Sequence, residues 1–147
     1  MRRAAAMVLR GVPGALFVWA GWSKLGSPLT TLASIYSYQI VLPDWLATAI
    51  ATTLPWMEIL VGLALLAGFW LPITLGWAAA LLMAFTALTA QAWWRGLPID
   101  CGCIPLDALH PALAVLSTPG GAVLRNITLL AMIAAAGFLS KRPTRQP

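Results

Sequence analysis

The chain has 147 residues, of which 61% are hydrophobic and only 9% are charged, and its formal net charge is +5. A soluble domain carries about 25% charged residues, so this composition excludes a water-soluble globular protein and indicates one membrane domain over residues 1–147. The positive charges gather at the two chain ends, which argues against nucleic acid as a partner.

Four apolar stretches are each long enough to cross a bilayer, because a spanning helix needs about 20 mostly apolar residues. They cover residues 4–22, 45–69, 72–94 and 121–139. The first stretch could be a cleaved signal peptide, but Arg10 and Pro13 interrupt it and no soluble region follows. Backbone groups in lipid must pair within the chain, so the predicted fold is an all-α integral membrane protein, a bundle of four transmembrane helices.

Residues 29–42, between the first two stretches, are too few and too polar to span. Their apolar residues recur at helical spacing, which predicts a short amphipathic helix on the extracytoplasmic membrane surface. The second stretch contains Glu58 well inside its apolar run. A carboxylate at that depth is costly and points to function or to a structural ion pair, with Lys24, Arg95 and Arg125 as candidate partners.

The charges also predict how the bundle is oriented. Basic residues flank both chain ends: Arg2, Arg3 and Arg10 at the first, Lys141, Arg142 and Arg145 at the second. The acids Asp44, Glu58, Asp100 and Asp107 fall toward the opposite side. Basic flanks remain on the cytoplasmic side of a membrane, so we expect a multi-pass membrane protein with both termini in the cytoplasm.

The only two cysteines, Cys101 and Cys103, are separated by a single glycine in the loop before the last helix. The predicted orientation puts this Cys-Gly-Cys loop on the oxidising side, where thiols form disulfides. A ring this small is strained, and strained, exposed disulfides exchange readily. A static staple explains it poorly, because closing so short a loop removes little entropy from the unfolded chain.

Other residues are expected to complete a redox site at this edge of the bundle. A basic neighbour favours the reactive thiolate, so Lys24, Arg95 and Arg125, together with Glu58, are predicted to organise the cysteine pair. A quinone in the membrane is the candidate electron acceptor, and no other cofactor motif occurs. Three aromatic residues are the candidate walls of its site: Trp22, Tyr36 and Trp56.

Several runs of the sequence together carry a resemblance to a known family. They are FVWAGWSK over residues 17–24, LPWME over 54–58, RGLPIDCGC over 95–103, and LRN over 124–126. In this order they resemble the MauE branch of the DoxX-like membrane proteins. The resemblance implies a four-helix inner-membrane bundle associated with periplasmic thiol chemistry, often beside a thioredoxin-like partner in methylamine dehydrogenase maturation.

The predicted function is a disulfide oxidoreductase that passes electrons between an extracytoplasmic thioredoxin-like or substrate protein and the membrane. Two alternatives stay open. Cys101, Cys103 and His110 could hold copper(I), which prefers soft sulfur ligands. The chain could instead be a non-catalytic assembly subunit of a membrane redox complex, with cysteines that its partner's maturation does not need.

Overall fold

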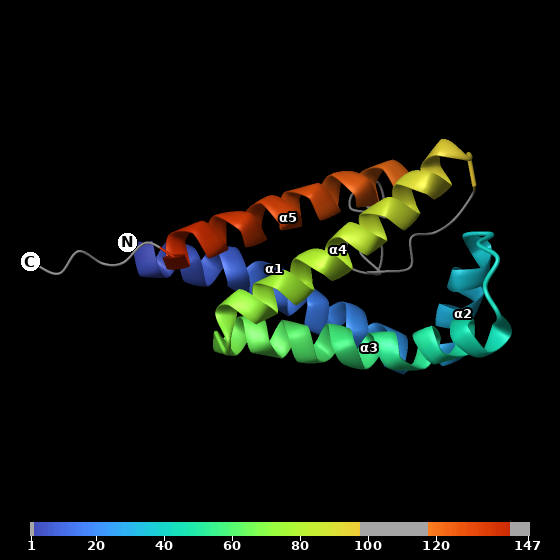
Figure 1. Cartoon of the computed structure of the whole chain (residues 1–147), viewed down its shortest axis with the longest axis horizontal. Coiled ribbons are helices and arrows are strands. Elements are labelled where there is room, and N and C mark those ends of the chain that lie inside the picture. Colours follow the sequence, from blue (N-terminus) through green and yellow to red (C-terminus); the bar gives the residue numbers. More distant parts are fainter. Residues whose placement is uncertain (1, 98–117, 142–147) are drawn as a thin grey trace, which may run out of the picture.

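The computed structural model describes residues 2–97 and 118–141 of the chain. Every element in these ranges is a helix: α1 (Arg2–Leu25), α2 (Pro28–Ser37), α3 (Asp44–Ala67), α4 (Leu71–Trp94) and α5 (Pro119–Lys141) (Figure 1). Of these, α1, α3, α4 and α5 are long and apolar enough to cross a membrane. The prediction of an all-α protein with four spanning helices is confirmed.

Each predicted span coincides with one long helix, and the boundaries differ by only a few residues. The short helix is also present, but α2 ends at Ser37 rather than at residue 42. Gln39 has φ 52°, a left-handed conformation that a helix does not continue through. The surface location predicted for α2 remains a prediction.

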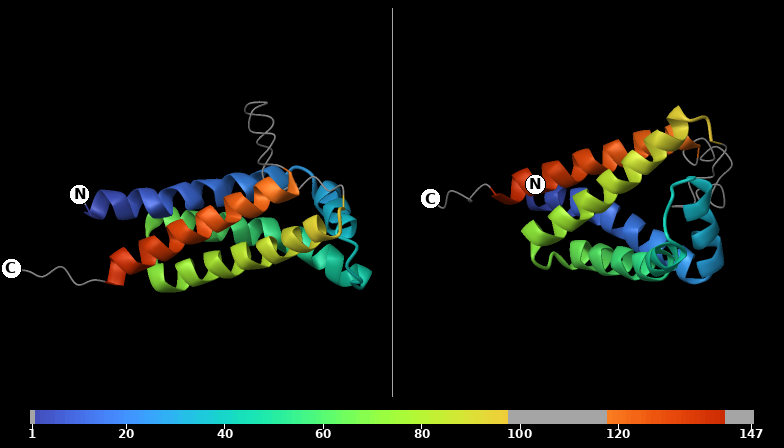
Figure 2. Two further views of the ribbon diagram at one scale, coloured as in Figure 1. Left: turned by 90° about the horizontal axis from the view of Figure 1, so that it is seen from above. Right: turned by 45° about the vertical axis from the view of Figure 1, so that its right-hand side comes forward.

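The four long helices form two closely packed pairs. The more extensive contacts are between α1 and α3 and between α4 and α5, and α1 also packs on α5. Although a short turn joins α3 to α4, the two helices diverge toward the end of the bundle that carries α2 (Figures 1 and 2). The first residues of α1 and the last residues of α5 lie together at the opposite end.

Small residues let α1 and α3 approach closely. A Cβ added at Gly21 would lie 2.6 Å from the carbonyl oxygen of Pro55, and one added at Gly62 would lie 2.7 Å from that of Gly14. Real side chains do not tolerate such distances, so these positions hold the two backbones in contact. Glycine at a helix interface is a common device in membranes, where tight packing replaces the hydrophobic effect.

The core lies between all four long helices and is built from aliphatic and aromatic side chains. Its buried members are Phe17, Leu65, Leu75, Ala78, Leu82, Leu129, Ile133 and Ala136. The outer faces remain apolar as well, with residues such as Leu60, Ile73 and Ile127 more than half exposed. An apolar surface around a bundle of spanning length fits contact with a lipid bilayer.

Candidate functional site

A buried ion pair joins the end of α1 to the middle of α3. The Lys24 ammonium donates hydrogen bonds to both Glu58 carboxylate oxygens, with Nζ–Oε distances of 2.6 and 2.8 Å. The two side chains are 9% and 2% exposed. The expectation that Glu58 faces the interior next to a basic residue is therefore confirmed. Charge at this depth is costly and marks a candidate functional site.

The glycine contact between α1 and α3 explains how this pair forms. Gly21 lies against Pro55 and Ile59, at the level of Glu58 on α3. Lys24 follows Gly21 by one turn, and a helical side chain leans toward the N-terminus of its own helix. The lysine therefore extends back along the seam to reach the carboxylate.

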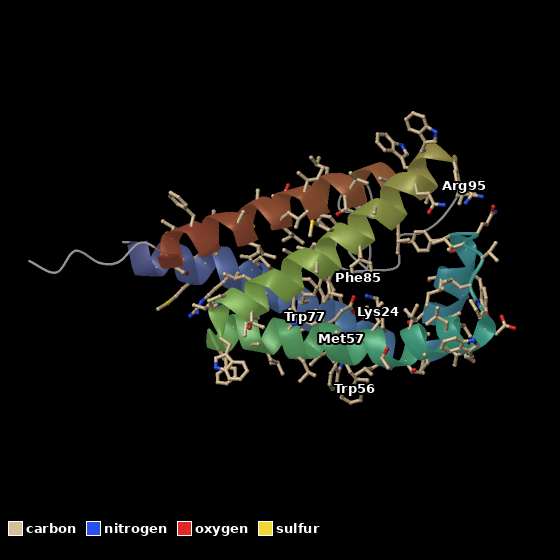
Figure 3. All side chains as sticks on the ribbon, in the orientation of Figure 1. Lys24, Trp56, Met57, Trp77, Phe85 and Arg95 are labelled. Carbon is tan, nitrogen blue, oxygen red and sulfur yellow. The ribbon has the colours of Figure 1, made fainter. Side chains whose placement is uncertain are left out.

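Phe85 on α4 brings a third helix to the pair. The Lys24 ammonium lies 5.3 Å from the centre of the Phe85 ring, a cation–π distance. In Figure 3 both side chains lie between α4 and the α1–α3 pair. The aromatic face partly replaces the water that the ammonium loses on burial.

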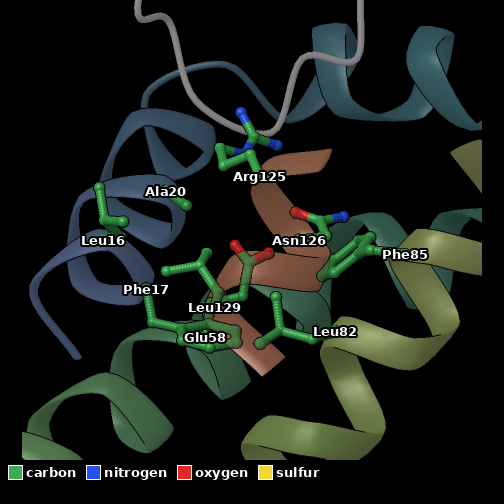
Figure 4. A pocket seen from close by; sticks show the side chains of 9 residues that line it. All are labelled: Leu16, Phe17, Ala20, Glu58, Leu82, Phe85, Arg125, Asn126 and Leu129. Carbon is green, nitrogen blue, oxygen red and sulfur yellow. The ribbon is translucent and has the colours of Figure 1, made fainter. Parts of the chain in front are cut away.

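On its other side, Glu58 borders a small pocket that α5 completes (Figure 4). Arg125 and Asn126 line this pocket, and Asn126 is buried. The pocket has a volume of about 30 Å³, room for a water molecule. The Nε atom of Arg125 is buried and donates no hydrogen bond within residues 2–97 and 118–141. The carboxylate thus has a paired cation on one side and, on the other, a small pocket whose mostly apolar lining also includes Arg125 and Asn126.

A larger cavity of about 550 Å³ opens next to Lys24. It is enclosed by the end of α1, by α2, and by the facing sides of α3 and α4. Lys24 and Phe85 belong to its lining, so the ion pair stands between this cavity and the small pocket. Neither Phe85 nor this cavity is among the sequence predictions, and Asn126 appears there only within the LRN run of the family resemblance.

Arg95 does not join the pair. It lies at the end of α4, exposed, and donates hydrogen bonds to Gln39 Oε1 at 3.1 Å and to the Tyr38 carbonyl oxygen at 3.5 Å. These bonds tie α4 to the segment between α2 and α3. The structure therefore brings together three of the predicted charged residues, Lys24, Glu58 and Arg125, and places the fourth elsewhere.

The three predicted quinone-site aromatics also lie away from this centre. Trp22, Tyr36 and Trp56 are 71%, 45% and 59% exposed, and none of them lines either of the two cavities. Tyr36 instead donates a hydrogen bond of 2.9 Å to Asp44 in the first turn of α3. This bond raises the pKa of Tyr36 above its ordinary value of 10.0, because it holds the phenolic proton against a carboxylate.

Cys101, Cys103 and His110 lie outside the described residues. The helices on either side of them are described: α4 ends and α5 begins in the half of the bundle that carries α2 (Figure 1). Within the described ranges, no three His, Cys, Asp or Glu residues are grouped so as to hold a metal ion.

Comparison with known proteins gives one positive result. The model of a family described as methylamine utilisation protein MauE matches residues 2–140. No curated protein and no solved structure gives a match. The matched range includes all four spanning helices, the Lys24–Glu58 pair and both cysteines, so the chain belongs to the MauE family of methylamine utilisation proteins.

Proposed function

We propose that this MauE-family membrane protein is a thiol–disulfide redox protein that serves the maturation of periplasmic proteins. It would exchange electrons between an extracytoplasmic thioredoxin-like or substrate protein and the membrane. The observation that carries the proposal is a shared location. The described residues that flank the cysteines, at the end of α4 and the start of α5, lie in the half of the bundle that carries α2 (Figure 1). The same half holds Lys24 and its buried ion pair, which an apolar bundle does not need for packing.

The exchange needs only the two cysteines of the chain, the dithiol of the partner and one electron acceptor. A partner's thiolate attacks the Cys101–Cys103 disulfide, a mixed disulfide forms, and the partner's second thiol resolves it, so the partner is oxidised and the pair reduced. Reoxidation of the pair releases two electrons and two protons. A quinone in the membrane would take up both and become a quinol.

The charged centre has two tasks in this scheme. Glu58 can hold a proton between the small pocket and the large cavity, since its carboxylate borders the first and its partner Lys24 lines the second. The cation Arg125 has a buried N–H without a described partner and is suited to stabilise a developing anion such as a thiolate.

Two features support an inner-membrane orientation with cytoplasmic termini. The start of α1 and the end of α5 lie at one end of the bundle (Figure 1), and six of the nine Lys and Arg residues fall in the sequence near the two chain ends. Arg10 packs there against Gly68, at the C-terminus of α3. Basic flanks of this kind stay on the cytoplasmic side. Labelling intact cells with a membrane-impermeant thiol reagent tests this orientation. Modification of the cysteines only after the inner face is opened would contradict it.

The direct test of the exchange is a trapping experiment. Cys101→Ser and Cys103→Ser are each expressed, purified without reductant, and analysed by mass spectrometry for a covalent partner. One of the two should accumulate a mixed disulfide with a thioredoxin-like or substrate protein. In the reverse of the forward reaction, the remaining cysteine attacks the partner's disulfide, and the second cysteine of this chain, which would release the adduct, is missing. The double variant is the matched control and should carry none. Absence of an adduct from both single variants would count against thiol exchange.

A further inference from the structure

The 550 Å³ cavity beside Lys24 has the size of a ligand site, since such sites occupy about 300–1,000 Å³. Its two walls differ in chemistry. The wall built from α2 and the end of α1 includes the apolar Ile35 but carries most of the polar groups: Ser23, Lys24, Ser27, Thr30, Thr31 and Ser34. The facing wall, from α3 and α4, is apolar and includes Ile50, Leu54, Phe85 and Leu88. Such an arrangement suits an apolar molecule with polar atoms at one edge.

The hydrogen bonds of the polar wall define what those atoms can be. Ser34 and Thr31 line the cavity and donate their hydroxyl protons to carbonyl oxygens of their own helix region, so their oxygens can act only as acceptors toward a ligand. Lys24 spends two of its three N–H groups on Glu58. The remaining ammonium N–H is a donor for a ligand oxygen, and the hydroxyl oxygens are acceptors for a ligand O–H group.

Charge and shape narrow the ligand further. Because Glu58 already neutralises Lys24, an anionic head group such as a phosphate would have to compete with a buried carboxylate at 2.6 Å. A neutral carbonyl oxygen can accept a hydrogen bond from the ammonium without displacing the carboxylate. Phe85 adds a flat aromatic surface next to the ammonium, and the leucine and isoleucine side chains beyond it offer contact for a hydrocarbon tail.

We propose that this cavity binds the ring of a quinone, with a ring carbonyl on the Lys24 ammonium, the ring beside Phe85 and the tail along Leu54 and Leu88. The α2 hydroxyl oxygens would accept hydrogen bonds from the quinol form. The proposal rests on the proposed function in one respect, the choice of a quinone as electron acceptor. It replaces the exposed aromatics Trp22, Tyr36 and Trp56 with a different set of walls.

The test measures binding without redox turnover. The full chain with both Cys101→Ser and Cys103→Ser is placed in lipid nanodiscs and photolabelled with an azidobenzoquinone that carries a short alkyl tail. Labelled peptides should map to α2 and to α4 near Phe85. Adding Leu54→Trp or, separately, Leu88→Trp fills the cavity and should weaken labelling at least about tenfold, or about 1.4 kcal/mol. Leu60→Trp, on an exposed face of α3, is the matched control and should bind normally.

Competition separates a quinone site from other outcomes. An unlabelled quinone of the same tail length should displace the probe, whereas an alkylbenzene without carbonyl groups should not. Equal displacement by the alkylbenzene, displacement by phospholipid alone, or equal labelling of the filled and control variants would each overturn the proposal. The protein in this experiment has no cysteines, so its result does not depend on thiol exchange. Failure of quinone binding and failure of the proposed thiol exchange can therefore be told apart.

Discussion

Removing one member of the Lys24–Glu58 pair should lower the free energy of unfolding far more than removing both. Both side chains are buried, and two short hydrogen bonds join them. Lys24→Met leaves a carboxylate buried with no partner, and Glu58→Met leaves a buried ammonium. A lone charge of this kind costs about 3–5 kcal/mol. The double variant leaves no buried charge, and replacing a pair by apolar residues of similar volume is often nearly neutral.

The coupling energy follows from these figures. If each single change costs about 3–5 kcal/mol and the double change about 0–2 kcal/mol, the two residues stabilise each other by several kcal/mol. Reversible unfolding of the four proteins in mixed micelles, followed by tryptophan fluorescence, measures this cycle. Additive losses in the double variant, with a coupling energy near zero, would refute the reasoning that Lys24 and Glu58 act as one buried unit.

The same site yields a functional prediction. Glu58→Gln keeps an oxygen that can accept a hydrogen bond from Lys24 but cannot take up a proton at neutral pH. Partner maturation should therefore fall more steeply than the amount of protein in the membrane. A variant that is scarce but fully active per molecule would show that Glu58 only ties α1 to α3.

Two further predictions concern packing and the α2–α3 junction. Gly21→Ala should destabilise the chain by about 1–3 kcal/mol, because the new methyl would overlap α3. Gly11→Ala has open space around it and should be neutral or stabilise α1 by up to about 1 kcal/mol. Denaturant unfolding measures both changes. In a Tyr38→Phe background, where Tyr36 is the remaining tyrosine, Tyr36 should ionise above pH 10.0. The stability that its protonated hydroxyl gives the folded state is complete below that pH and is lost as the pH rises through the folded-state pKa. Asp44→Asn should lower the midpoint of the ultraviolet titration, and an unchanged midpoint would contradict the hydrogen bond.

The fold was predictable because lipid leaves few choices. Four apolar runs of spanning length allow little other than helices, and a buried carboxylate demands a partner. What the sequence could not decide was which cation pairs with Glu58. Lys24, Arg95 and Arg125 all flank the same half of the bundle, and the choice depends on the close contact of Gly21 with Pro55, which sets the depth of Lys24 relative to Glu58.

The cavity was missed for a different reason. Trp22 and Trp56 are plausible walls for a ring by residue type alone, but periodicity does not show which side of a helix faces lipid when both sides are apolar. A usable signal was present in the short helix. Ser27, Thr30, Thr31 and Ser34 recur at helical spacing, which indicates one hydroxyl-rich face, and that face lines the cavity.

The proposed function depends on thiol exchange by Cys101 and Cys103. The most direct measurement is maturation of the periplasmic partner in cells that express the double Cys→Ser variant at wild-type membrane levels, with bound copper analysed in the same purified protein. Thiol exchange predicts that maturation is lost while the four-helix fold and the metal content stay unchanged. Normal maturation would contradict the claim and leave an assembly role, and loss of copper together with maturation would contradict it in favour of soft-metal handling.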